Sequence, residues 1–86
     1  MREFKYDYTI SKENNPTEFK KICKIISDMC QDFIASKLLI DVDGSTIQVY
    51  SKENQQIVVY DDYDIGAVFV KSDIDLSAIL SDTKAA

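Results

Sequence analysis

The side chains most able to do chemistry in this sequence are three aspartates and a tyrosine between two apolar runs, Asp61, Asp62, Tyr63 and Asp64. Such a group can bind a divalent cation, form a solvated turn, or contact a positively charged protein. We favour the third interpretation, because tyrosine is a rigid anchor and is enriched among the residues that dominate binding at interfaces. The sequence therefore predicts a partner-binding loop at these four residues.

A second acidic motif lies in the segment Leu38–Ser45, LLIDVDGS. It resembles the first motif of the haloacid dehalogenase superfamily, which implies a nucleophilic first aspartate, a general-acid second aspartate and a bridging Mg²⁺. The chain is too short for that family's core, however, and the next residues, 46–50, alternate as a strand. An EF-hand calcium loop is also excluded, because the twelfth position from Asp41 is Lys52 rather than glutamate. We interpret the motif as a hairpin turn and predict no metal and no cofactor.

Nucleophilic catalysis has little support from the remaining residues. The chain has no histidine, which would activate a thiolate or complete a zinc site. Its two cysteines, Cys23 and Cys30, are seven residues apart on a predicted helix, or about 10 Å along the axis. That separation is too large for a disulfide between them. We predict two buried free thiols and a protein that is not an enzyme.

The charge distribution is uneven along the chain. Residues 41–86 hold nine carboxylates and three lysines, whereas residues 1–40 hold seven basic and six acidic side chains, and the total is −5. An acidic protein is poorly suited to bind nucleic acid directly, because phosphates attract clustered lysine or arginine. The excess of negative charge in one half instead favours a positively charged protein partner.

A strand followed by a long helix is predicted in the first part of the chain. Residues 3–10 alternate between apolar and polar side chains, as a half-buried strand does. Asn15, Pro16 and Glu18 then form a helix start, with a cap, a proline at the first position and a capping box. Apolar residues recur at intervals of three or four positions as far as Phe33, and this spacing predicts an amphipathic helix of about 20 residues.

Four strands and a short helix are predicted in the rest of the chain. Residues 38–50 are expected to form a hairpin with a two-residue turn at Asp43-Gly44, which would pair Ile40 with Ile47. Two strands, 56–60 and 65–70, are apolar on both faces, as central strands are.

The C-terminal helix is expected to begin at Ser72 as its cap, with Asp73 and Asp75 at its positive end. We expect these two aspartates to lie beside the acidic loop and to extend the partner-binding surface.

The predicted fold is a single α+β domain, residues 1–86, with elements in the order β-α-β-β-β-β-α. Short loops between consecutive strands favour an antiparallel sheet of about five strands. We expect the long helix to cover one face and the short helix to cover part of the other. No apolar leader follows Met1, and no apolar run approaches the roughly 20 residues that cross a bilayer, which predicts a cytoplasmic protein that does not bind membranes.

In size, charge and layout the chain resembles bacterial toxin-immunity proteins, including those of contact-dependent inhibition systems. That resemblance implies stoichiometric occlusion of a basic toxin, typically a nuclease, whose cleft attracts polyanions. One alternative is a nucleic-acid mimic, encoded by a phage or plasmid, that inhibits a defence enzyme. Another is a noncatalytic adaptor that uses a sheet edge, with the first strand as the candidate. The sequence leaves the partner's identity, the strand order and the oligomeric state open.

Overall fold

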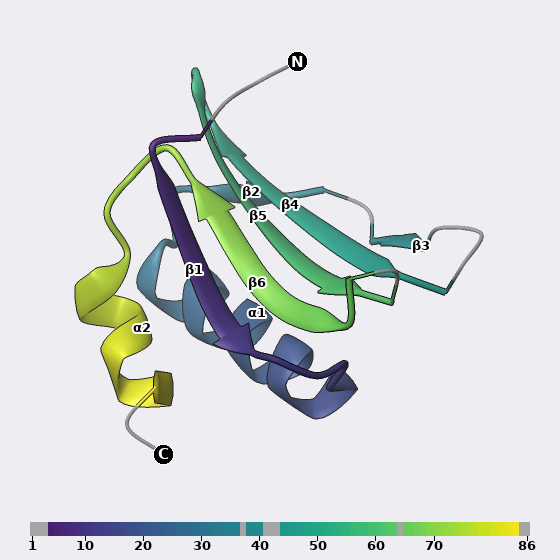
Figure 1. Ribbon diagram of the computed structural model, residues 1–86. Helices are drawn as coiled ribbons and strands as arrows, with labels where there is room; N and C mark the ends of the chain where they lie inside the picture. The colour runs from purple at the N-terminus through teal and green to yellow at the C-terminus, as the bar shows by residue number, and fades with distance from the viewer. Residues whose placement is uncertain (1–3, 37, 41–43, 64, 85–86) are drawn as a thin grey trace.

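The computed structural model describes residues 4–36, 38–40, 44–63 and 65–84, with side chains as far as Leu80. It is an α+β fold with one antiparallel sheet and two helices (Figure 1). The elements are β1 (Tyr6–Ser11), α1 (Pro16–Met29), β2 (Ile34–Ala35), β3 (Leu39–Ile40), β4 (Thr46–Lys52), β5 (Gln55–Asp62), β6 (Ala67–Ser72) and α2 (Ser77–Lys84).

The sheet has the order β1-β6-β5-β4-β2, and β3 also pairs with β4. The chain therefore lays its first strand beside its last one, while β4, β5 and β6 follow one another as neighbours. The fold class and the antiparallel sheet agree with the sequence prediction. The additional strand, β2, was not predicted.

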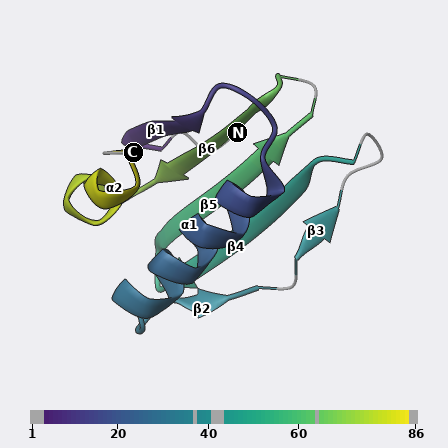
Figure 2. The same cartoon turned by 90° about the horizontal axis from the view of Figure 1, so that it is seen from below.

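Both helices pack on the same face of the sheet, with α1 across β4 and β5 and α2 beside it toward β1 (Figure 2). The expectation that α2 covers the opposite face is wrong. Leu76, which directly precedes α2, and Leu80, within α2, are almost fully buried in the cluster that contains Ile22 and Ile26 of α1. The second face of the sheet carries no helix in the described part of the chain.

The helix α1 begins as predicted but ends early. Asn15 caps it by accepting a hydrogen bond from the Glu18 amide, at 3.1 Å. The helix has 14 residues rather than about 20, and the Cys30 amide closes it by donating to Ile26 O, at 2.8 Å. Ile34, in the edge strand β2, then pairs with Ser51 of β4.

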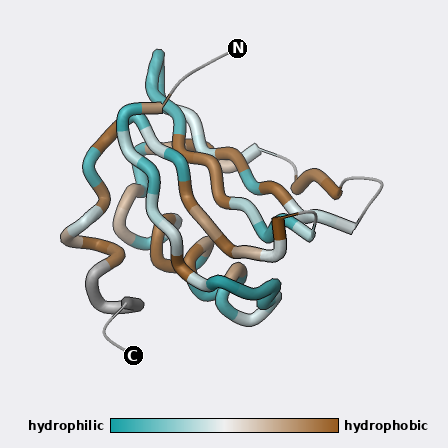
Figure 3. The backbone as a smooth tube through the Cα atoms, viewed as in Figure 1, coloured by the Kyte–Doolittle hydropathy of each residue, from teal (hydrophilic) through white to brown (hydrophobic). Residues whose placement is uncertain are grey.

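The edge of β4 is shared by two short strands. Leu39 pairs with Ile47 and Ile40 with Thr46, so the predicted pairing of Ile40 with Ile47 is wrong by one residue. The predicted turn residue Asp43 lies outside the described residues. The short strand β3 is a hydrophobic segment at one side of the sheet (Figure 3), and Ile40 is 72% exposed.

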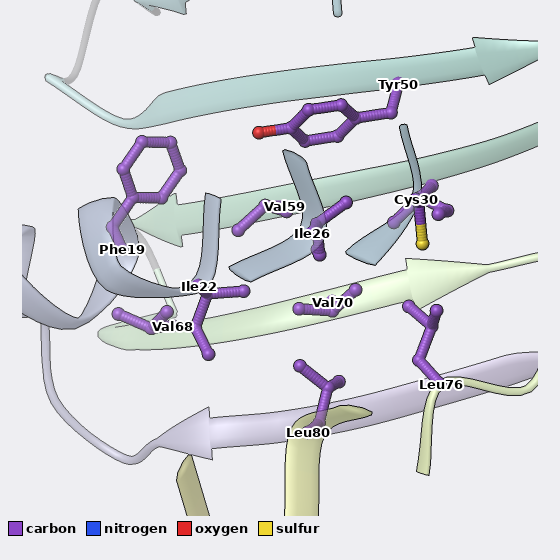
Figure 4. Close-up of a cluster of buried hydrophobic side chains, with 11 residues drawn as sticks. Phe19, Ile22, Ile26, Cys30, Tyr50, Val59, Val68, Val70, Leu76 and Leu80 are labelled. Carbon is purple, nitrogen blue, oxygen red and sulfur yellow. The ribbon is translucent and has the colours of Figure 1, made fainter. Parts of the chain in front are cut away.

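The core lies between the helices and the inner face of β5 and β6 (Figure 4). Alternate residues of these strands point into it, because side chains on a strand alternate between the two faces. The fully buried members are Ile22, Ile26, Ile57, Val59, Val68, Val70 and Leu76. Fully burying an aliphatic side chain of this size contributes about 1.5–3 kcal/mol. The core therefore fixes which residues of β5 face the helices.

Candidate functional site: the end of β5 and the adjoining cavity

Asp61 is buried, so the expectation that it belongs to an exposed acidic loop is wrong. It lies on β5 on the same face as Val59, and it is 2% exposed. Its Oδ1 accepts hydrogen bonds from Asn14 Nδ2, at 3.1 Å, and from the Asn15 amide, at 3.3 Å. The carboxylate therefore holds the residues that precede α1 against the end of β5.

Asp62 and Tyr63 form the start of the turn after β5. Asp62 Oδ1 accepts a hydrogen bond from the Ile65 amide, at 3.0 Å, and the Asp62 carbonyl accepts one from the Gly66 amide, at 2.8 Å. The Tyr63 amide donates to Ser45 Oγ, at 2.8 Å. The turn is therefore held by both its side-chain and its backbone groups.

The ring of Tyr63 is exposed and lies close to Gly44. The side chain is 47% exposed. A Cβ atom added to Gly44 would lie 3.3 Å from Cδ2 of the ring, so glycine allows a close approach there. Gly44 also has a φ of +92°, which disfavours any other residue. The predicted anchor residue is thus exposed, whereas Asp64 lies outside the described residues.

Asp73 and Asp75 lie at the other end of the sheet, so the expectation that they adjoin Asp61 is wrong. Asp73 Oδ2 accepts a hydrogen bond from the Gln56 amide, at 2.8 Å. Gln56 precedes Asp61 by five residues on β5, which corresponds to about 16 Å along a strand. These two aspartates therefore do not share a surface with Tyr63.

Asp75 stabilises the start of α2. Its Oδ1 accepts hydrogen bonds from the Ser77 amide, at 2.9 Å, from Ser77 Oγ, at 2.7 Å, and from the Tyr8 hydroxyl, at 3.1 Å. The bonds from Ser77, and then the one from Tyr8, lower the pKa of Asp75. Ser72, which was expected to cap this helix, instead ends β6, and its hydroxyl bonds to the backbone of Ile74. The predicted helix start is therefore wrong by several residues.

A cavity of about 340 Å³ lies between the first half of α1 and the strands β3 and β4. Most of its surface is apolar, and Asp61 and Tyr63 both belong to its lining. The lining residues are Pro16, Phe19, Lys20, Cys23, Leu38, Ile40, Thr46, Gln48, Asp61 and Tyr63. This cavity could not be predicted from the sequence, because it depends on β3 lying apart from α1.

Tyr50 links α1 to β4 on the same side of the sheet. Its hydroxyl donates to Cys23 O, at 2.9 Å, and accepts from Ser27 Oγ, at 3.3 Å. Burial raises the pKa of Tyr50 to about 12. Burial also raises the pKa of both thiols, Cys23 and Cys30, which are free. A raised pKa reduces the thiolate fraction, so neither thiol has the environment of an activated nucleophile.

The face of the sheet away from the helices carries a row of apolar side chains. Leu39, Ile47, Tyr60 and Phe69 are successive partners across β3, β4, β5 and β6. The rings of Tyr60 and Phe69 stack with centroids 4.6 Å apart. Lys71 Nζ lies 5.9 Å from the centroid of the Phe69 ring. The row is therefore partly covered by its own neighbours.

Among the described residues, no three side chains of histidine, cysteine, aspartate or glutamate lie together as a metal site would require. Within the same residues, neither helix has the length and apolar character needed to cross a membrane.

Comparison with known proteins gives no relative for this chain. No protein-family model matches it, and no curated protein or solved structure matches it either.

Proposed function

We propose that this protein is a noncatalytic inhibitor that binds a basic protein, of the kind that a nuclease toxin presents, and occludes its active site stoichiometrically in the cytoplasm. The observation that carries this proposal is the exposed ring of Tyr63, which lies close to Gly44, follows Asp62 in the chain and lines the cavity. Binding of this kind would make the protein an immunity protein for its toxin.

The support begins with how the anchor is attached to the rest of the protein. Tyr63 is attached to Ser45 through its amide and lies against Gly44. An aromatic side chain that is already ordered loses little conformational freedom when a partner covers it. Anchors of this type near a pocket account for a large part of the affinity at many interfaces.

The surroundings of Tyr63 provide apolar area for a partner to cover. Leu38 and Ile40 line the cavity and are 44% and 72% exposed, and Ile65 is 68% exposed in the same turn as Tyr63. Exposed apolar groups that gather in this way are typical of interaction sites rather than of ordinary surface. The proposed surface therefore consists of Tyr63, Asp62 and the rim of the cavity.

The charge of the chain supports a basic partner. The formal charge is −5, and the aspartates at positions 61, 62 and 64 lie next to the anchor in sequence. Opposite charge on a partner increases the rate of association, and salt reduces that increase. A nuclease cleft has the required positive charge because its substrate is a polyanion.

The proposal is tested with the protein encoded by the neighbouring open reading frame, expressed as the candidate toxin. We expect coexpression to relieve its toxicity and the purified proteins to form a one-to-one complex. Tyr63→Ala should weaken that complex by roughly 2 kcal/mol or more, as loss of an interface anchor does. Tyr6→Ala is the matched control, since Tyr6 is a tyrosine of similar exposure, 37%, on β1.

A sheet-edge adaptor remains the second candidate, because β1 does lie at the edge of the sheet. An adaptor that adds a partner strand to β1 predicts the opposite pattern of effects. If Tyr6→Ala weakens the complex and Tyr63→Ala does not, the occlusion proposal is wrong and the adaptor is favoured.

A further inference from the structure

The cavity beside α1 is lined in part by the carboxylate of Asp61, one of whose two oxygens faces no donor among the described residues. Asp61 lines the cavity and is 2% exposed. Both of its hydrogen bonds, from Asn14 and Asn15, end on Oδ1. Within the described part of the chain, Oδ2 accepts no hydrogen bond and no lysine or arginine forms an ion pair with Asp61.

Among the described residues, every fully buried side-chain oxygen has a hydrogen-bond partner, so Oδ2 is open to the cavity and to its solvent. Moving a carboxylate out of water is costly, and two hydrogen bonds from neutral groups offset only part of that cost. A positive group that enters the cavity would gain an interaction strengthened by the apolar surroundings. The walls formed by Phe19, Leu38 and Ile40 require that this group arrive on an apolar stem.

The geometry favours an ammonium over a guanidinium. A guanidinium binds a carboxylate best through two parallel hydrogen bonds, which need both oxygens. Because Oδ1 of Asp61 already has two donors, a single oxygen is left, and a compact point charge suits it better. We propose that the cavity binds a lysine side chain of the protein partner, with the ammonium on Asp61 Oδ2 and the methylenes against the apolar walls. This proposal rests on the proposed function, since it assumes a protein partner.

Lys20 allows a second test of the proposal that the cavity binds a positively charged group. It also lines the cavity, and its side chain is exposed. Its positive charge opposes the entry of a second cation into the cavity. Replacing it with methionine keeps an apolar stem and removes the charge, so Lys20→Met should bind the incoming lysine more tightly.

The test uses N-acetyl-lysine methylamide as a probe, titrated into the ¹⁵N-labelled protein and followed by two-dimensional NMR. We expect saturable shifts at amides around the cavity, chiefly those of Phe19 and Ile40. Asp61→Asn should weaken binding about tenfold, because it replaces a charge-assisted hydrogen bond with a neutral one. Lys20→Met should strengthen binding, and N-acetyl-norleucine methylamide, which has no ammonium, should bind about tenfold more weakly than the lysine probe.

Several results would overturn the proposal. Equal binding of the lysine and norleucine probes would show that the cavity recognises only apolar groups. Tighter binding of N-acetyl-arginine methylamide would show that the preference for an ammonium is wrong. Asp61→Asn should fold, because the amide oxygen can accept the bonds from Asn14 and Asn15. If it does not, Ile40→Ala provides the second variant, since a residue 72% exposed can be truncated safely and should still weaken the lysine probe.

This experiment separates the two proposals. If the probe does not bind but Tyr63→Ala still disrupts the complex with the toxin, only the lysine proposal fails. If the probe binds in an Asp61-dependent way but Tyr63→Ala leaves the complex intact, the cavity binds lysine and the occlusion surface is wrong.

Discussion

Replacing Tyr50 with phenylalanine tests how α1 is attached to the sheet. The change removes the hydroxyl that donates to Cys23 O and accepts from Ser27 Oγ. Neither partner group loses all of its hydrogen bonds. Cys23 O remains the acceptor of the amide four residues later within α1, and Ser27 is exposed to water. We therefore expect Tyr50→Phe to fold with an unchanged structure.

The magnitude follows from the number of good hydrogen bonds that are lost. The bond to Cys23 O, at 2.9 Å, has the length of a strong interaction, whereas the bond from Ser27, at 3.3 Å, is long. A single neutral hydrogen bond contributes about 1 kcal/mol net, and here no buried group is left unpaired. The free energy of unfolding at pH 8 should therefore fall by about 1 kcal/mol.

The difference between the two proteins should then disappear at high pH. The ordinary pKa of tyrosine is about 10, and burial raises that of Tyr50 to about 12. Because the folded pKa is the higher one, the stabilisation is complete below pH 10 and is lost as the pH rises toward 12. The full shift corresponds to about 2.7 kcal/mol. The exposed Ser27 brings the hydroxyl close to solvent, so we expect about half of that value.

The assay is urea unfolding followed by circular dichroism at several pH values between 8 and 12. Tyr8 and Tyr60 also have a raised pKa, chiefly through burial. They are present in both proteins, so the difference between wild type and Tyr50→Phe isolates Tyr50. We expect the wild type to lose its advantage, and the phenylalanine variant to equal or exceed it near pH 12. A constant difference across this range would refute the assignment of Tyr50 as a buried, neutral hydrogen-bonding group.

Three further changes should alter the free energy of urea unfolding by different amounts, and a fourth serves as a control. Tyr8→Phe should cost about 1–3 kcal/mol, more than Tyr50→Phe, because the amide of the buried Leu76 loses its 2.8 Å acceptor; a smaller loss would mean that water replaces the hydroxyl. Asn15→Ala should cost about 1 kcal/mol through loss of the helix cap, and an unchanged midpoint would contradict that role. Ile22→Ala should lower the free energy of unfolding by about 2–5 kcal/mol. Met29→Ala, at a position 65% exposed on the same helix, is the control and should change it by less than about 0.5 kcal/mol. Equal effects of the two substitutions would refute the assigned core.

Much of the fold could be predicted because local signals agreed with the tertiary structure. Asn15 and Pro16 fixed the start of α1, since a cap and a first-turn proline act within a few residues. The end of α1 could not be predicted in the same way. Phe33 continues the helical spacing of apolar residues, but the next two residues, Ile34 and Ala35, pair with β4, which is a long-range interaction.

The candidate site was only partly predictable for a related reason. The exposure of Tyr63 agrees with the prediction from its acidic surroundings. The burial of Asp61 could not be deduced, because Ile57–Tyr60 is apolar on both faces and gives no sign of which residues point inward. Once the core selects Val59, alternation along the strand places Asp61 inward and Tyr60 outward. The distance between Asp73 and Asp61 likewise depends on β6, the strand that lies between them in the chain.

The pairing of β1 with β6 has a consequence for how the molecule is made. Tyr8 bonds to the Leu76 amide across 68 positions, and β1 finds its sheet neighbour only in residues near the C-terminus. On the ribosome the first strand therefore has no sheet neighbour until residues 67–72 have emerged. Contacts between distant parts of a chain slow folding, so the hairpin of β4 and β5 is expected to form first and β1 to join last.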